Sequence, residues 1–251
     1  MMHRPIALTR FAAFAIALGG AGAALAQSEA KPNTDPLEGW NRAVFGFNEA
    51  IDRAVLVPLA KGYQAVVPEL VRTGVTNVFA NFGDGWSAIN QALQGKGEAA
   101  STMTMRVVAN TLFGIGGLFD VASDLGMERQ SEDFGQTLGR WGVGPGPYFV
   151  WPLLGPSTIR DTVARPLDLA WSPTRLTDHD PTRYAITGLQ LIDTRANLLG
   201  ATRVLDDIAL DKYTFVRDAY LARRRNLVYD GDPPEEPQDD GPAAAPPASP
   251  K

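Results

Sequence analysis

Residues 141–159 (WGVGPGPYFVWPLLGPSTI) form an apolar run of nineteen residues without a single charge. Four prolines interrupt it: Pro145, Pro147, Pro152 and Pro156. Proline removes a backbone donor and breaks the helical ladder, so this run cannot form a membrane-spanning helix. The pattern predicts apolar, irregular backbone.

A second run, residues 107–119 (VVANTLFGIGGLF), is also uncharged and ends in a glycine cluster. Two explanations stay open for both runs. They are either buried core loops rich in turns, or backbone that lines a lipid-sized cavity or rests at a bilayer surface. The second explanation is favoured because the chain also carries an export signal and many aromatic residues.

The N-terminus has the features of that signal. Arg4 and Arg10 precede an apolar stretch that ends in Ala24-Leu25-Ala26, so residues 1–26 are predicted to be a cleavable signal peptide. A retained anchor is the weaker alternative, because the stretch is short for a span of about 20 residues. The chain has no cysteine, which excludes disulfides and thiolate sites and predicts that the protein is not a lipoprotein.

Charge is distributed unevenly along the chain. Residues 230–251 hold six acids and one lysine in a Pro/Ala-rich sequence, which predicts a disordered, dispensable tail. Residues 27–34 are expected to be a short disordered lead-in. Residues 27–229 hold 20 basic and 22 acidic residues, so the body has no broad basic face and nucleic acid is excluded as a partner.

Between these segments the sequence alternates helical patterns with Gly/Pro punctuation. A helix is expected to start at Asp35-Pro36-Leu37-Glu38 and to end near Pro58. Others are expected at 70–82, 86–93 and 97–112, from Asp180-Pro181, and after Asp211 as a cap. No alternating β-branched run is long enough to suggest strands, so the fold class should be mainly α.

Residues for catalysis or cofactor binding are sparse. The mature chain has one histidine, His179, and no G-x-S-x-G serine motif, so a Ser/His/Asp hydrolase is poorly supported. Acidic residues lack the spacing of zinc or calcium sites, and the glycine clusters lack the pattern of phosphate-binding loops. We therefore expect no enzymatic activity, no metal and no cofactor.

Several motifs resemble, in order, those of the MlaA/VacJ family. The run DPLEGWNR at 35–42 is followed by FGFN at 45–48, NTLFGIGG at 110–117, DFGQTL at 133–138 and WGVG at 141–144. The similarity covers residues 35 to about 220. It departs from the family pattern at the mature N-terminus, where many members carry a lipidated cysteine.

The resemblance implies a single ring-like helical domain at 35–229, with amphipathic helices and irregular Gly/Pro-rich apolar loops around a channel. It also implies a place in the inner leaflet of the outer membrane beside trimeric porins. Phospholipids misplaced in the outer leaflet would pass through the channel to a periplasmic lipid-binding carrier, which maintains lipid asymmetry.

A phospholipid path needs apolar walls, a wetted polar side and bending points. We expect it to involve fifteen residues, each of which could instead be a buried helix contact. They are Phe45, Phe47, Asn48, Asn110, Thr111, Leu112, Phe113, Ile115, Gly116, Gly117, Trp141, Gly142, Val143, Gly144 and Tyr148. Two alternatives are an exported envelope scaffold associated with porins that moves no lipid, and a lipase-like hydrolase built on His179.

Overall fold

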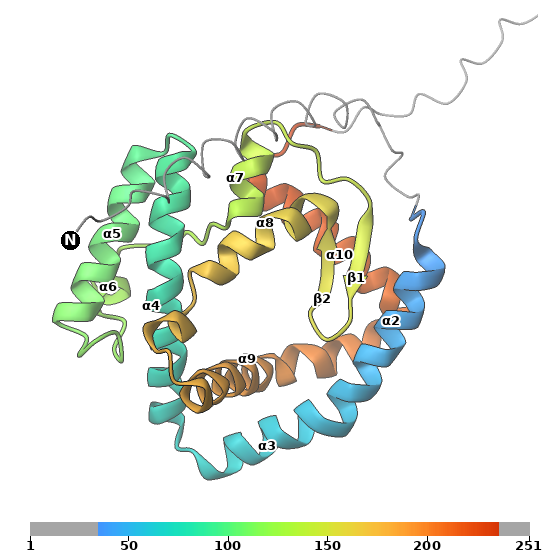
Figure 1. The fold of residues 1–251 in the computed structure, drawn as a ribbon, viewed down its shortest axis with the longest axis horizontal. Coiled ribbons are helices and arrows are strands. Elements are labelled where there is room, and N and C mark those ends of the chain that lie inside the picture. The colour runs from blue at the N-terminus through green and yellow to red at the C-terminus, as the bar shows by residue number, and fades with distance from the viewer. Residues whose placement is uncertain (1–34, 236–251) are drawn as a thin grey trace, which may run out of the picture.

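The computed structural model describes residues 35–235, which fold into a ring of helices with one small antiparallel sheet (Figure 1). This confirms the expectation of a mainly α, ring-like fold. The expected signal peptide at 1–26, the lead-in at 27–34 and the tail beyond residue 235 lie outside the described residues.

One side of the ring is a long helical rod made of α2 (Glu38–Ile51), a π-helical turn η1 (Asp52–Leu56) and α3 (Val57–Val66). The expected end near Pro58 was wrong. Pro58 has no N–H, and its ring would clash with the carbonyl four residues earlier in a regular helix. The wider turn before it, in which the Val57 N–H donates to the Asp52 oxygen, lets the helix continue.

The opposite side is formed by α4 (Glu69–Leu93), which packs along α5 (Gly97–Leu112), with the short α6 (Val121–Asp124) beside them. In Figure 1, α5 and α6 lie outside α4 with respect to the centre of the ring. The helix at 97–112 was predicted correctly. The two helices expected at 70–82 and 86–93 are one, because Asp84, buried between two glycines, accepts hydrogen bonds from arginines that hold the backbone in place.

The uncharged run at 141–159 is irregular only in its first part, which follows α7 (Phe134–Arg140). Strands β1 (Tyr148–Trp151) and β2 (Gly155–Thr158) pair in antiparallel register, with Val150 opposite Pro156. The prediction of irregular backbone without strands was therefore wrong here. In a two-stranded sheet both strands are edges, so Pro156 removes no required donor.

The chain closes the ring through α8 (Ile159–Ala170), the 3-10 turn η2 (Pro173–Leu176), α9 (Asp180–Ile208) and α10 (Lys212–Val228). The predicted starts of α9 and α10 are confirmed, whereas α2 begins at Glu38, after a turn at residues 36–37, and not directly after Asp35. Pro181 lies in the first turn of α9, and the Asp211 side chain accepts from the Tyr213 and Thr214 N–H groups at the start of α10.

The first residues of the predicted tail are part of the fold. Asp230 forms an ion pair with Lys96, with 2.5 Å between Oδ1 and Nζ, and Arg225 donates a hydrogen bond to the Pro234 carbonyl. A boundary at Asp230 therefore cuts through a turn that the sequence pattern assigned to disorder.

Burial is inverted relative to an ordinary globular protein. Of the eleven largest fully buried side chains, only Met103 and Val150 are apolar. Large apolar side chains lie outside instead: Phe113 is 72% exposed and Val66 is 81% exposed. The apolar core cluster is small, consisting of Val44, Tyr148, Val150 and Tyr213.

The most buried charge is Arg106 on α5, whose side chain is fully enclosed. Its Nε donates to Asp84 at 3.2 Å and its Nη2 to Asp120 at 2.9 Å. Burial would raise the pKa of Asp120, but hydrogen bonds from Ser123 and Asn110 and the charges of two arginines lower it to about 2. Arg106 therefore joins α4, α5 and the start of α6.

We expect Arg106→Met to reduce the free energy of unfolding by about 3–5 kcal/mol, because it leaves the Asp84 carboxylate buried without its enclosed partner. Urea unfolding of the detergent-solubilised protein measures this. Arg129→Met is the matched control, since Arg129 is partly exposed and its loss leaves Asp84 paired with Arg106. Similar losses for both variants would contradict a special role for the buried arginine.

Candidate functional site

The hairpin is attached to α2 by two asparagine side chains one heptad apart. The Asn41 amide donates to the Tyr148 carbonyl at 3.1 Å and accepts from the Val150 N–H at 2.8 Å. Asn48 repeats this arrangement further along the helix, donating to the Trp151 carbonyl at 2.9 Å and accepting from the Leu153 N–H at 2.7 Å. Each side chain thus satisfies backbone groups that a third strand would otherwise pair.

The turn of the hairpin presents apolar side chains to the exterior. Leu153 is 65% exposed with a φ of 63°, and Leu154 is 54% exposed. A positive φ is uncommon for leucine, so the hydrogen bond from the Leu153 N–H to Asn48 helps to hold this conformation. In the view of Figure 1 the hairpin projects inward from the rim of the ring, with its turn towards α9.

At the base of the hairpin the buried Tyr213 is surrounded by polar partners that reach the surface. Tyr213 on α10 donates its hydroxyl proton to Asp35, and burial together with this carboxylate raises the pKa of Tyr213. The Arg42 guanidinium lies 4.4 Å from the centre of the Tyr213 ring and pairs with Asp211 at 2.8 Å. These contacts join the start of α2 to the start of α10.

Arg224 fixes α10 against α7 and α8. Its guanidinium lies 2.5 Å from Asp133, the N-cap of α7, and 2.9 Å from Asp161 in the first turn of α8. Burial would raise the pKa of Asp133, but the hydrogen bonds and charge of Arg224 outweigh it and lower the pKa. Asp133 therefore stays ionised. It caps the N-terminus of α7 and also binds Arg224 on α10.

A buried carboxylate with uncharged partners closes the ring at α9. Asp193 accepts from the Tyr63 hydroxyl at 3.1 Å and from the Thr76 hydroxyl at 2.8 Å. One helix turn further on, Asn197 donates to the same Thr76 oxygen at 3.0 Å. Asp193 thus connects α9 to both α3 and α4.

Three of the predicted site residues lie on α2. Phe47 is exposed, and Asn48 holds the turn of the hairpin. Phe45 is partly buried and packs edge to face on Tyr213, with ring centres 5.8 Å apart. Of the three, only Asn48 therefore contacts the hairpin backbone through a polar side chain.

The predicted residues at 110–117 divide into a buried anchor and an exposed apolar loop. Asn110 is buried, donating to Asp120 and accepting from the Ala122 N–H. Gly117 has a φ of 93° and lies so close to Asn81 that a Cβ would approach it to 3.0 Å. The remaining predicted residues of this segment are exposed: Thr111, Leu112, Phe113, Ile115 and Gly116.

The predicted residues at 141–148 lie away from the 110–117 segment, and only Trp141 among them donates a side-chain hydrogen bond to α4. The Trp141 indole donates to the Leu93 carbonyl at 3.2 Å, at the C-terminal end of α4. Thr111 instead accepts from Asn81, which lies twelve residues before Leu93 on the same helix. Twelve helical residues span about 18 Å, so the fold does not bring the two segments together. Gly142 and Gly144 are exposed, Val143 is partly buried, and Tyr148 is in the core cluster.

Sequence reasoning missed Asn41, the turn leucines Leu153 and Leu154, and the carboxylates Asp84 and Asp193. The heptad spacing of Asn41 and Asn48 places both on one face of the helix. This spacing could have indicated that the two side chains bind the same partner segment. Nothing in the local sequence distinguished Leu153 from the other apolar residues around it.

The only histidine among residues 35–235 does not lie in a cleft with a nucleophile. His179 is exposed at the start of α9, where its ring contacts the Thr182 hydroxyl. Among residues 35–235 no helix is both long and apolar enough to cross a bilayer, and no acidic or histidine cluster is suited to a metal ion.

We expect Asn48→Ala to weaken the turn of the hairpin selectively, because it removes two hydrogen bonds worth about 1–3 kcal/mol together. Hydrogen exchange should accelerate at the Leu153 amide and remain slow at Val150, which Asn41 holds. Asn48→Asp, which keeps the acceptor for Leu153 but not the donor, should lie between wild type and Asn48→Ala. Equal exchange in all three proteins would show that Asn48 does not restrain the turn.

Comparison with known proteins places this architecture in a family. Residues 33–227 match the model of the MlaA lipoprotein family. The intermembrane phospholipid transport system lipoprotein MlaA of Haemophilus influenzae is 34% identical over 222 residues, which cover 86% of this chain and 88% of the relative. Its Escherichia coli counterpart of the same name is 33% identical, with 89% and 92% covered.

The fold agrees with this result. A solved structure described as the structural basis for maintenance of bacterial outer membrane lipid asymmetry is 33% identical, with a TM-score of 0.68. The match covers 78% of this chain and all of that one. The chain therefore belongs to the MlaA lipoprotein family.

Proposed function

We propose that this protein transports phospholipid at the outer membrane of a Gram-negative cell. It removes misplaced phospholipid from the outer leaflet, passes it to a periplasmic carrier and so maintains lipid asymmetry. The observation that carries this proposal is the inverted burial, with polar side chains inside and large apolar ones outside. Two family members are named as components of an intermembrane phospholipid transport system.

The surface that contacts the bilayer includes the last residue of α5 and the loop after it. Leu112, Phe113 and Ile115 are each about 70% exposed, and no charge occurs between Arg106, which is enclosed, and Asp120. The buried Asn110 and Gly117 fix the loop so that these side chains face outward. An exposed apolar patch of this kind is typical of a membrane or protein contact.

The lipid path borders the hairpin at the centre of the ring. The turn offers apolar Leu153 and Leu154, while Asn48 and the backbone that it holds supply polar groups beside them. An apolar surface next to a polar one suits a molecule with acyl chains and a charged head group. No chemical step is involved, and we propose that the protein is not an enzyme.

The same exposed apolar surface supports a location in the membrane. We propose that the protein lies in the inner leaflet of the outer membrane, with a trimeric porin as its neighbour. Because the sequence has no cysteine to acylate, the apolar surface supplies attachment. A single acyl chain contributes only marginal membrane binding, so losing it costs little binding free energy. A large apolar surface on the protein can supply the same contribution.

Co-purified lipid tests the proposal. The protein is extracted from outer membranes with detergent, purified, and read by mass spectrometry for bound phospholipid. A transporter should carry phospholipid, and deleting its gene should raise outer-leaflet phospholipid. A porin-associated scaffold, the alternative function, would carry none and leave the leaflets unchanged.

We expect Ile115→Asp to fold and to lose most of its membrane association. Moving a carboxylate from water into contact with acyl chains costs several kcal/mol of free energy, which opposes insertion of this loop into the bilayer. Aspartate also tolerates the φ of 52° at this position better than isoleucine does. Fractionation of outer membranes measures the effect, and circular dichroism checks the fold.

The matched control is Thr182→Asp at an exposed position in the first turn of α9, where a negative charge is favourable. It should stay with the membrane. If Ile115→Asp also stays there and still clears outer-leaflet phospholipid, the loop does not contact the bilayer.

A further inference from the structure

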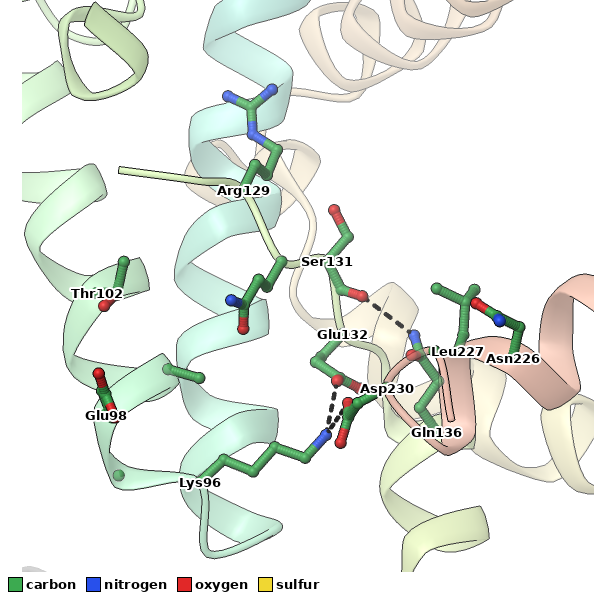
Figure 2. Close-up of a pocket in the computed structure, with 14 residues that line it drawn as sticks. Lys96, Glu98, Thr102, Arg129, Ser131, Glu132, Gln136, Asn226, Leu227 and Asp230 are labelled. Atoms are coloured by element: carbon green, nitrogen blue, oxygen red, sulfur yellow. Dashed lines mark hydrogen bonds and ion pairs between the residues drawn. The ribbon is translucent and has the colours of Figure 1, made fainter. Parts of the chain in front are cut away.

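Most cationic side chains in the described part of the chain are paired with carboxylates. A cavity of about 800 Å³ between the start of α5 and the end of α10 is an example (Figure 2). Lys96 on its wall donates to Glu132 at 3.0 Å and to Asp230 at 2.5 Å, as the dashed lines show. The other cation of the wall, Arg129, donates to Asp84 at 2.9 Å. Neither of these two side chains therefore needs an anionic ligand.

Arg165, in the middle of α8, is an exception. It is partly buried, yet its guanidinium has no ion pair, hydrogen bond or ring contact among residues 35–235. A guanidinium has five N–H donors and is always charged, so leaving it partly buried without acceptors is unfavourable. The other described cations that lack such partners are all exposed: Lys61, Arg140, Arg175, Arg203 and Arg223. Arg165 is therefore the cation most in need of an anionic partner.

The carboxylates nearest to Arg165 on the same helix are engaged elsewhere. Asp161 and Asp168 lie one helical turn before and after it, at spacings that usually allow an ion pair. Asp161 instead binds Arg224 on α10 at 2.9 Å. Asp168 accepts a hydrogen bond from the Trp86 indole on α4 at 2.8 Å. The fold thus directs both acids towards other helices and leaves Arg165 without them.

The exposed face of α8 is apolar and points towards the centre of the ring. In Figure 1, α8 lies between α7 and that centre. The buried face of α8, which includes Arg160 and Ala164, packs against α7. Ile159, Val163 and Leu169 lie on other sides of the helix and are 40%, 47% and 58% exposed. The helix therefore offers apolar surface to a molecule inside the ring.

Arg165 lies on the flank of α8 that faces the hairpin. Thr162 is three residues before it and Leu169 four residues after it, so the three side chains share one side of the helix. The Thr162 hydroxyl accepts from the Trp151 indole, at the end of β1, at 3.1 Å. Trp151 is also the residue whose carbonyl Asn48 binds. The cation therefore lies beside the hairpin, next to the path proposed for the lipid.

A partly buried cation beside apolar surface suits a lipid with an anionic group. We propose that Arg165 binds the phosphate of the phospholipid in transit, while the acyl chains lie along Ile159 and Val163. The proposal rests on the proposed function, because it names the residue that recognises the transported lipid. A guanidinium can donate two parallel hydrogen bonds to one phosphate. Since every phospholipid has this phosphate, Arg165 selects phospholipid as a class over uncharged lipid, whatever the head group.

Binding of short-chain lipids to the full mature protein in nonionic detergent tests the role of Arg165. Calorimetric titration compares dihexanoyl phosphatidylcholine with dihexanoylglycerol, which has the same acyl chains and no phosphate. We expect the wild type to bind the phospholipid at least about tenfold more tightly, the gain typical of hydrogen bonds to a charged group. Arg165→Gln should lose this preference and bind the two lipids with similar affinity.

Three comparisons separate recognition from structure. Arg165→Lys keeps the charge but not the planar fork, so its preference for phospholipid should be intermediate. Arg223→Gln removes an exposed cation on α10, next to Arg224, whose side chain faces α7 and α8; it should bind lipid as the wild type does. Because Arg165 has no partner among residues 35–235, Arg165→Gln should also leave the urea midpoint of unfolding unchanged.

An unchanged preference for phospholipid in Arg165→Gln would overturn the proposal. A lowered midpoint of unfolding would also overturn it, because it would assign the side chain a structural role. Inorganic phosphate that binds the wild type as tightly as the phospholipid does would show that the site takes a free anion instead.

In each of these cases, phospholipid recovered with the wild-type protein from outer membranes would still support transport. A wild-type protein that carries no phospholipid would instead overturn the proposed function, so the two failures are distinguishable.

Discussion

Hydrogen bonds from buried polar side chains hold the helices of this ring together. The apolar cluster around Val150 is too small to join elements so far apart in the sequence. Asn41 fixes the hairpin to α2, Arg106 fixes α5 to α4, and Asp193 fixes α9 to α3 and α4. In a bilayer this arrangement is well suited, because apolar faces gain little by leaving lipid for one another and close polar contacts supply much of the specificity.

The outward apolar residues then have two separate tasks under the proposed function. Those of the loop after α5 lie on the outer side of α4, where they meet the bilayer. Those at the turn of the hairpin lie within the ring, where they meet the lipid in transit. Asn48 positions the second group, because its side-chain oxygen accepts the hydrogen bond from the Leu153 N–H and so stabilises the positive φ of Leu153. The same physical property, exposed apolar surface, thus serves attachment in one place and passage in another.

Local sequence signals predicted much of the helical framework. Asp211 and Asp180-Pro181 mark helix starts by mechanisms that need no tertiary context, and the glycines after Leu112 mark the end of α5. Tertiary contacts decided the rest. Pairing of Asp84 with arginines carries α4 through its glycines, and Asn41 stabilises strands in a segment whose prolines argued against them. The candidate site was only partly predictable, because Asn48 stood out as a polar neighbour of phenylalanines but its backbone partners lie about a hundred residues away.

The π-helical turn at Asp52–Leu56 sets the phase of the rod as well as its continuity. Asn41 and Asn48 are seven residues apart and share a face, and the same heptad would continue to Val55 and Gly62. One inserted residue rotates the remainder of the rod by about 100°, so the face continues instead to Leu56 and Tyr63. Tyr63 has the hydroxyl that reaches Asp193 on α9, and Gly62 has no side chain to offer. Because of this one extra residue, the same face of the rod binds the hairpin through Asn41 and Asn48 at one end and contacts α9 through Tyr63 at the other.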